Sequence, residues 1–532
     1  MKRFSANQPS FAFAENVRRR GMVLILVLIV VTLLALGAYS FTDLMLTYNE
    51  ATLLAGRQTQ TRLLVDSGVE MTRSFLTQSE EVRQQAGGLF NNPERFQGVT
   101  VVPDDDLRDR ASFSIVAPSI TDDGELGGVR HGLEDESTRL NLNTLLITEK
   151  QQAGAASALL MALPGMTEEV ADAILDWLDE DEEQRPLGAE SDYYSGVSPP
   201  YACKNGPLQT VEELLLVRGV TPRLLFGSDV NRNGMVDPHE QLQENTEIVE
   251  GGERGWSAYL TLYSLENNLR PDAQPRIYLN EPDLNKLSTD LSAVFPAEWV
   301  TFILAYRQGG PYAGDEEAEA GVTGELDLTK PAKAPLVQLL DLVGAKTRVT
   351  FTGSQEATVL ASPFTEELGA MNGYMPQLMD NTTINPAKTI PGRINVNQAP
   401  RTILAGIPGM SEDIVNQIMT RRETDTATEN EGRRHETWLL AEGVVTLPEM
   451  RALMPFVNGG GDVFRGQVVG YFQSGHAASR AEVVFDATRS PVRVLFWRDI
   501  SHLGRGYALE TLGVDYTEGV APNAQPLPAS GL

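Results

Sequence analysis

The sequence is short of cysteine, histidine and basic residues. Its one cysteine, Cys203, excludes an internal disulfide framework. A part folded outside the cytoplasm would then need another cross-link, for which a bound metal ion is the obvious candidate. The five histidines lie apart, and none belongs to an H-E-x-x-H metal motif. Lysine and arginine number 43 against 72 aspartate and glutamate, and the net charge of −29 repels nucleic-acid phosphates, so we expect no nucleic-acid partner.

The motifs of common enzyme classes are also missing. No serine lies in a G-x-S-x-G sequence, and no phosphate-binding P-loop is present. Carboxylate pairs are frequent, but chance alone produces them in a chain this acidic. We therefore predict that the protein is not an enzyme.

One N-terminal segment lacks charge, and a longer stretch around it lacks proline. Residues 22–39 carry no charge, and no proline occurs between Pro9 and Pro93. At 1.5 Å per residue, a helix over 22–39 nearly crosses a ~30 Å hydrocarbon layer. The arginines at 18–20 keep the N-terminus in the cytoplasm. We expect one membrane-spanning helix that continues as a stem to residue 78, with the rest of the chain outside the cytoplasm.

Three interpretations of this segment are open. A signal peptidase could cut near residues 35–38, although the apolar core is longer than the ~7–15 residues usual in signal peptides. The segment could also remain uncut as a plain anchor. The third interpretation is cleavage between Gly21 and Met22 on the cytoplasmic face. We favour it because R-R-R-G directly before an apolar run resembles the prepilin peptidase site of type IV pilins and type II secretion pseudopilins. That resemblance implies a leader at 1–21 and an N-methylated Met22.

The fifth residue after the expected cut distinguishes this chain from most pilins. Counted from Met22, it is Leu26. Most pilins have glutamate there, and its carboxylate pairs with the amine of the subunit ahead in the filament. A carboxylate without a partner is costly in hydrocarbon. Absence of this glutamate is a hallmark of the type II secretion pseudopilin protein K and suits a subunit at the filament tip.

The rest of the chain predicts an α+β fold. Short alternating stretches at 79–138 and 459–516 predict a small antiparallel sheet, and 517–532 reads as a disordered tail. Between them, R-L-N-L-N, R-I-Y-L-N and R-I-N-V-N begin successive copies of a repeated, mostly helical segment. We predict a first repeat, a partial repeat with extra sequence, and a second repeat at 139–275, 276–390 and 391–458.

Two proline-glycine turns in the repeats resemble helix-hairpin-helix (SAM-like) units. They lie in L-P-G-M before Thr167 and in I-P-G-M before Ser411. Hairpins that bind DNA usually have a second glycine where Thr167 and Ser411 stand. Acidic residues follow both positions and would repel phosphate. We therefore favour protein-binding packing units over DNA contacts.

The stem, the sheet and the inserted helical repeats together resemble the type II secretion protein K family. The local match rests on I-N-V-N-Q-A-P, on D-W-L-D-E-D running to G-A-E-S-D-Y-Y, and on K-N-G-P-L-Q-T-V-E-E-L. The resemblance implies a single-pass inner-membrane protein with its bulk in the periplasm, at the tip of the pseudopilus, where it would nucleate assembly. It implies the I, J and H minor pseudopilins, the major pseudopilin and prepilin peptidase as partners, with secreted cargo or the secretin as further candidates.

The sharpest chemical motif is D-V-N-R-N-G-M-V-D-P-H-E, which fits a twelve-residue EF-hand loop for Ca²⁺. Gly234 stands at position 6, where such a loop turns sharply. We expect chelation to lower the melting temperature. A poor helix follows the loop, which favours a lone structural clip over a paired sensor. The candidate ligands are Asp229, Asn231, Asn233, Met235 (through its carbonyl), Asp237 and Glu240.

A second metal site is a weaker hypothesis, supported by the family resemblance because calcium is known in the helical domain of such pseudopilins. Asp179, Asp181, Glu190 and Asp192 could converge if residues 186–188 turn the chain back. The alternative is a solvated acidic loop. Two rival functions also stay open: the tip subunit of a type IV or DNA-uptake pilus, and an uncut, membrane-anchored, calcium-stabilised scaffold.

Overall fold

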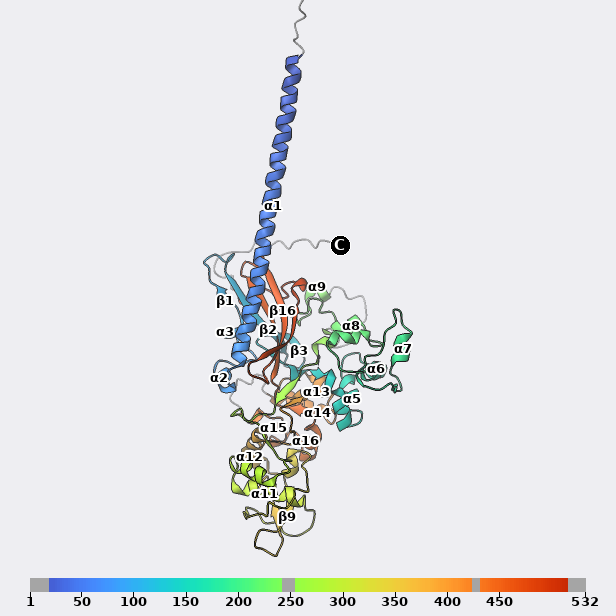
Figure 1. Ribbon diagram of the computed structural model, residues 1–532, viewed down its shortest axis with the longest axis vertical. Helices are drawn as coiled ribbons and strands as arrows, with labels where there is room; N and C mark the ends of the chain where they lie inside the picture. Colours follow the sequence, from blue (N-terminus) through green and yellow to red (C-terminus); the bar gives the residue numbers. More distant parts are fainter. Residues whose placement is uncertain (1–18, 242–253, 423–430, 515–532) are drawn as a thin grey trace, which may run out of the picture. The chain divides into compact units, whose positions relative to one another are not determined.

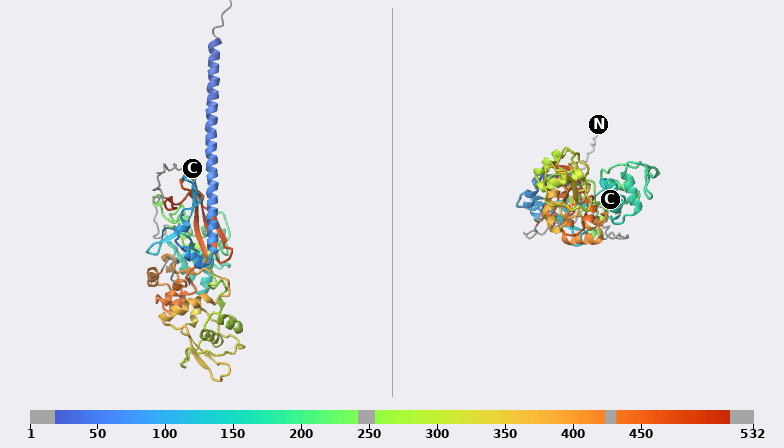
Figure 2. Two further views of the ribbon diagram at one scale, coloured as in Figure 1. Left: turned by 90° about the vertical axis from the view of Figure 1, so that its left-hand side faces the viewer. Right: turned by 90° about the horizontal axis from the view of Figure 1, so that it is seen from below.

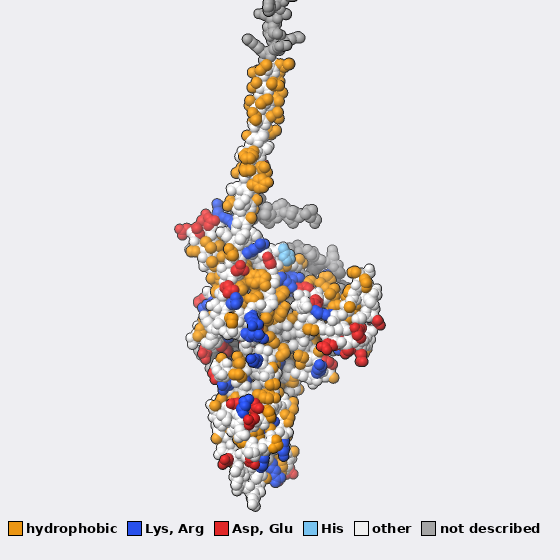
Figure 3. Space-filling view, viewed as in Figure 1, with side chains coloured by type: hydrophobic (Ala, Val, Ile, Leu, Met, Phe, Trp, Pro, Cys, Tyr) orange, Lys and Arg blue, Asp and Glu red, His pale blue; other side chains and the backbone are white. Residues whose placement is uncertain are grey.

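The computed structural model describes residues 19–241, 254–422 and 431–514, in two units, 1–60 and 61–532. The expected tail and most of the expected leader lie outside the described residues. Helix α1 (Arg19–Leu76) confirms the long N-terminal helix. Its apolar side chains between residues 22 and 48 are exposed, as the orange band in Figure 3 shows. Among the described residues, this is the one helix long and apolar enough to cross a membrane.

The second unit contains the expected antiparallel sheet. Its main path runs β1-β2-β15-β16-β17, with β3 paired to β2 and β4 paired to β15 (Figure 1). Strands from before and after the long insertion therefore join in one sheet, where β2 pairs with β15. The bounds are β1 (Val99–Val102), β2 (Ala111–Ile120), β3 (Leu126–His131), β4 (Glu134–Asp135), β15 (Val463–Phe472), β16 (Ala478–Asp486) and β17 (Arg493–Asp499).

Each face of the sheet has its own apolar cover. The end of α1 buries Leu64, Val65 and Val69 against Val468 and neighbouring side chains on one face. On the other face a second cluster forms around β2, β15 and the C-terminal segment 507–514. Alternation along β15 explains this division, because successive side chains of a strand point to opposite faces. The short helices α2 (Glu80–Gln85) and α3 (Pro93–Phe96) follow α1.

The inserted segment is built from short helices, as its sequence predicts. Figure 1 shows them in green to orange, and Figure 2 shows the same parts from two other sides. The helices are α4 (Leu145–Gln151), α5 (Ala155–Met161), α6 (Glu168–Leu178), α7 (Ser191–Ser195), α8 (Pro222–Phe226), α9 (Pro238–Gln241), α10 (Leu284–Ser292), α11 (Ala297–Gly309), α12 (Leu368–Asn381), α13 (Arg401–Ala405), α14 (Glu412–Arg421), α15 (Trp438–Ala441) and α16 (Leu447–Leu453).

The three R-x-x-x-N copies fold alike. Each forms a two-residue parallel pair with a distant segment: β5 (Leu140–Asn141) with β6 (Leu260–Thr261), β8 (Ile277–Tyr278) with β11 (Thr382–Thr383), and β13 (Ile394–Asn395) with β14 (Val457–Asn458). The last asparagine of each copy then bonds distant backbone: Asn143 to Leu208, Asn280 to Leu336 and Asn397 to Gly459. The asparagines therefore close loops that the sequence pattern alone does not reveal.

The remaining strands form two antiparallel ribbons. β7 (Leu265–Asn267) pairs with β12 (Thr389–Pro391), and β9 (Lys346–Val349) pairs with β10 (Thr358–Ala361). The second ribbon and α11 belong to the extra sequence, and they contact one another. The extra sequence shares the large apolar core of the insert, with residues such as Phe302 and Phe364 fully or nearly fully buried.

Candidate functional site

The loop at 229–240 has the backbone that a calcium-binding loop requires. Gly234 has a φ of +78°, a conformation open to glycine at the sharp turn. The Asp229 carboxylate accepts hydrogen bonds from the N–H groups of Asn233, at 3.0 Å, and Gly234, at 2.8 Å. The Asn233 side-chain oxygen accepts one from the Met235 N–H at 2.7 Å. These contacts wrap the backbone around the first ligand position.

The remaining polar groups of the loop face one another. Glu240 is buried, and its carboxylate accepts the N–H groups of Asn231, at 3.1 Å, and Asp237, at 2.9 Å. The side-chain amides of Asn231 and Asn233 donate to Asp237, at 2.7 and 3.1 Å. Among the described residues, the buried Oδ1 of Asn231 has no hydrogen-bond partner. Burial and the nearby Glu240 raise the pKa of Asp229. A cation would give these oxygens a partner, so the residues present fit Ca²⁺ after amide rotation.

The second candidate set is only partly brought together. Glu190 is buried with its carboxylate beside the Cys203 thiol; burial, and then the charges of Asp176 and Asp179, raise its pKa to about 7. Arg185 already holds Asp179, at 2.5 Å, and Asp176, at 2.7 Å. The other two members, Asp181 and Asp192, are exposed.

Within the part of the chain that the structure describes, no three carboxylate, imidazole or thiol groups stand together as a ready metal site. Both candidate sets explain why. Backbone N–H and amide donors occupy the oxygens of the loop, and a guanidinium occupies the acidic segment. Metal binding at either place therefore requires side-chain rotation.

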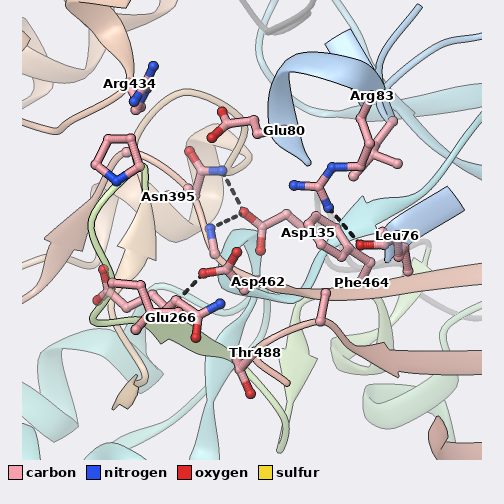
Figure 4. Close-up of a pocket in the computed structure, with 18 of the residues that line it drawn as sticks. Leu76, Glu80, Arg83, Asp135, Glu266, Asn395, Arg434, Asp462, Phe464 and Thr488 are labelled. Carbon is pink, nitrogen blue, oxygen red and sulfur yellow. Dashed lines mark hydrogen bonds between the residues drawn. The ribbon is translucent and has the colours of Figure 1, made fainter. Parts of the chain in front are cut away.

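A polar cavity of about 860 Å³ lies in the second unit, between the sheet end and the insert. Figure 4 shows Asp135 and Asp462 near each other in it, with Arg83 and Arg434 on either side. Burial raises the pKa of Asp462 to about 6, against the opposing effects of the Asn267 N–H and Arg83, and the charges of Asp135 and Glu266 add smaller upward effects. Asp135 itself is held by Asn395 at 2.9 Å and the Gly461 N–H at 2.7 Å.

The first arginine of each repeat copy has a distinct environment. Arg139 binds both carboxylate oxygens of Glu134, and Arg393 binds both of Glu266. Arg276, at the same position of the middle copy, lines the cavity and makes no ion pair with a described residue. Burial lowers its pKa. Sequence reasoning missed these arginine–glutamate pairs, although the arginine shared by the three copies could have indicated them.

Comparison with known proteins finds a family match at the start of the insert. Residues 138–226 match the family model of type II secretion system (T2SS) protein K. Over these residues the chain is similar to protein K. The resemblance drawn from its motifs is thereby confirmed.

Two relatives of known identity extend the comparison. Type II secretion system protein K of Aeromonas hydrophila is 37% identical over 119 residues, which cover 19% of this chain and 35% of that protein. The match thus spans about a third of this curated relative. The crystal structure of the GspK–GspI–GspJ complex from the type 2 secretion system of enterotoxigenic Escherichia coli aligns over 84% of this chain and 99% of that chain, with a TM-score of 0.32 and 12% identity.

Side chains of the chain itself cap the helices that follow the two proline-glycine turns. Thr167 caps α6 by accepting the Val170 N–H, and Ser411 caps α14 in the second repeat by accepting the Ile414 N–H. Two acidic residues stand in the first turn of each helix. The helix N-termini therefore already have acceptors and negative charge.

Proposed function

We propose that the protein is a minor pseudopilin of type II secretion that sits at the tip of the pseudopilus. One observation carries this proposal: an apolar helix runs on into a stem that packs on an antiparallel sheet, and the sheet is interrupted by an insert whose start is similar to protein K. An apolar segment with a folded part of this size suits a subunit that waits in the inner membrane and is then drawn into a filament.

Processing at Gly21–Met22 would expose the apolar run at the new N-terminus. Met22 and the residues that follow are exposed on α1, so they are available to the membrane and to partner stems. Leu26 is 64% exposed and offers no carboxylate to an amine of a subunit ahead. This supports a terminal position, because a subunit with no neighbour ahead needs no such pair.

The partners would be the other minor pseudopilins of the I, J and H types, the major pseudopilin and prepilin peptidase, with secreted cargo or the secretin as further candidates. Nucleation of assembly is part of the proposal. The repeat hairpins, which we assign to the helix-hairpin-helix (SAM-like) class, would serve as protein-binding surfaces. Their capped, acidic helix starts disfavour DNA and hence a role at the tip of a DNA-uptake pilus.

We further propose that Ca²⁺ binds the loop at 229–240. Asp229, Asp237 and Glu240 would supply carboxylates, Asn231 and Asn233 amide oxygens, and Met235 its carbonyl. The bound ion would neutralise carboxylates that burial now crowds together. The buried carboxylate of Glu190 supports a second ion beside Asp179, where the ion would have to displace Arg185.

The processing test decides the main proposal. Mass spectrometry of the mature N-terminus is compared between cells with and without prepilin peptidase. We expect a chain that begins at an N-methylated Met22 when the peptidase is present, and the uncut chain when it is absent. A chain that keeps Met1 in both strains would refute the pseudopilin mechanism and support the plain anchor. A start near residues 35–38 would support a signal peptide.

A further inference from the structure

The calcium loop belongs to the insert in sequence, but its polar contacts reach the sheet. It follows α8, a helix of the insert. The side chain of Gln467, on β15, donates to the carbonyl of Arg232 at 2.7 Å. Arg480, on β16, donates to the carbonyl of Asn231. The loop is therefore held by two neighbouring strands far away in sequence.

Apolar and charged contacts at the same place strengthen this attachment. Met235 packs against the cluster on the second sheet face, which includes Val469 and Tyr471. The guanidinium of Arg232 lies 4.3 Å from the ring centre of Phe226 and 3.5 Å from Glu212, and Glu212 also binds Arg498 of β17. Two nearby arginines hold the pKa of Glu212 low against the opposing effect of burial. The loop and the neighbouring Glu212 thus join the insert to three strands.

One contact fixes the orientation of a ligand. The Asn233 side-chain NH₂ donates to the carbonyl of Gly506 at 2.7 Å, in the C-terminal segment that covers the sheet. With its nitrogen held there, the oxygen of the same amide is turned into the loop, where it accepts the Met235 N–H. Asn233 is 2% exposed, so this amide has little freedom to turn. The contact with Gly506, together with the bond to Asp237 at 3.1 Å, therefore holds the Asn233 amide in one orientation.

We propose that Gln467, Arg480 and the Gly506 carbonyl are positioning residues for the calcium loop, and that the loop with its ion is a clasp that fixes the insert to the sheet. This inference rests on the calcium site proposed above. The same contacts order the ligands and join the insert to the sheet. Calcium binding and the junction between insert and sheet are therefore thermodynamically coupled. Calcium strengthens the junction, and an intact junction strengthens calcium binding.

The test uses the purified full-length chain in detergent micelles, with calcium as the probe. Gln467→Met keeps the length of the side chain and touches no ligand, but removes the hydrogen bond to the Arg232 carbonyl and the one accepted from Tyr507. Gln473→Met is the matched control, because Gln473 bonds Ser112 and not the loop. By calorimetry we expect the Kd for calcium to rise about fivefold or more in Gln467→Met and to stay unchanged in the control.

Hydrogen exchange of the unmutated chain gives a readout that does not depend on a variant folding well. Adding calcium should slow amide exchange in the loop and also around Gly506 and in β15 and β16. Protection confined to 229–240, or an unchanged Kd in a folded Gln467→Met, would overturn the clasp and leave the calcium site standing. No heat of binding in the unmutated chain would overturn both the calcium site and the clasp. None of these three outcomes bears on cleavage at Met22.

Discussion

The stem lies so close to the sheet that a single added methyl group should separate them. Gly470, on β15, faces α1. A Cβ there would lie 2.4 Å from the Thr61 carbonyl oxygen, 2.8 Å from Leu64 Cβ and 3.0 Å from Val65 N. Two of these atoms belong to the backbone of the helix and cannot rotate away. Gly470→Ala therefore forces the helix itself to move.

The size of the effect follows from two opposing contributions. Displacing the helix by about 1 Å disturbs the packing of Leu64 and Val65, which are each 3% exposed, and overpacking of a tight core costs about 1–3 kcal/mol. Alanine in a strand recovers roughly 0.5–1 kcal/mol, because glycine loses more conformational freedom on folding. Since the clashing atoms are backbone, we place the steric cost at the upper end and expect a net loss of about 2 kcal/mol in the stability of the sheet.

The control is the same substitution where space is free. Gly373 lies inside α12 with no atom within 4 Å of a built Cβ. Gly373→Ala should stabilise its helix by roughly 1 kcal/mol. Hydrogen exchange of β15 and β16 amides in the full chain measures the free energy of opening of the sheet. If the free energy of opening in Gly470→Ala equals that of the unmutated chain, the close packing of stem and sheet is refuted.

Two further predictions concern charge. Leu26→Glu should impair co-purification with the other minor pseudopilins, because a carboxylate with no partner costs about 2.5–3.5 kcal/mol at the centre of a membrane helix. Leu26→Ala is the control. If the Leu26→Glu chain assembles normally, only the bulk of the insert remains as a reason for the tip position. Asp462 has its pKa raised by burial to about 6 in the folded chain, so the folded state holds this proton more tightly and its contribution to stability falls as pH rises from about 4 to 6. Asp462→Asn should raise stability at pH 7.5 and flatten this part of the profile in thermal unfolding; an unchanged profile would contradict the shift.

Local patterns were enough to predict the stem and the sheet. A long run without proline and with apolar spacing favours a helix, and α1 confirms the long N-terminal helix. The alternating stretches at the C-terminus are confirmed as β15, β16 and β17. The α+β class and the protein K resemblance are confirmed as well. The predicted domain limits and the helix-hairpin-helix class stay predictions.

The metal residues show where local reasoning ends. The twelve-residue spacing predicts the turn at Gly234, because backbone conformation there depends on neighbours in sequence. It cannot predict that the Asn233 amide is held by Gly506, since that contact joins residues 273 positions apart. The same limit applies to the acidic segment. Spacing alone did not reveal that Arg185 would lie beside Asp179 and compete with a cation for it.

The shortage of cysteine, which opened the question of how this chain is cross-linked, has a partial answer in buried arginines. Arg393 joins Glu266 across 127 residues, and Arg465 joins Glu136 across 329 residues at 2.5 Å. Such pairs cost desolvation when they form, so they add little net stability. Removing one partner, however, leaves the other charge buried without its counter-ion, which costs about 3–5 kcal/mol. Arrangements of distant segments that break such a pair are therefore disfavoured. An inserted domain of linked repeats needs this selectivity when no disulfide can hold its distant segments together.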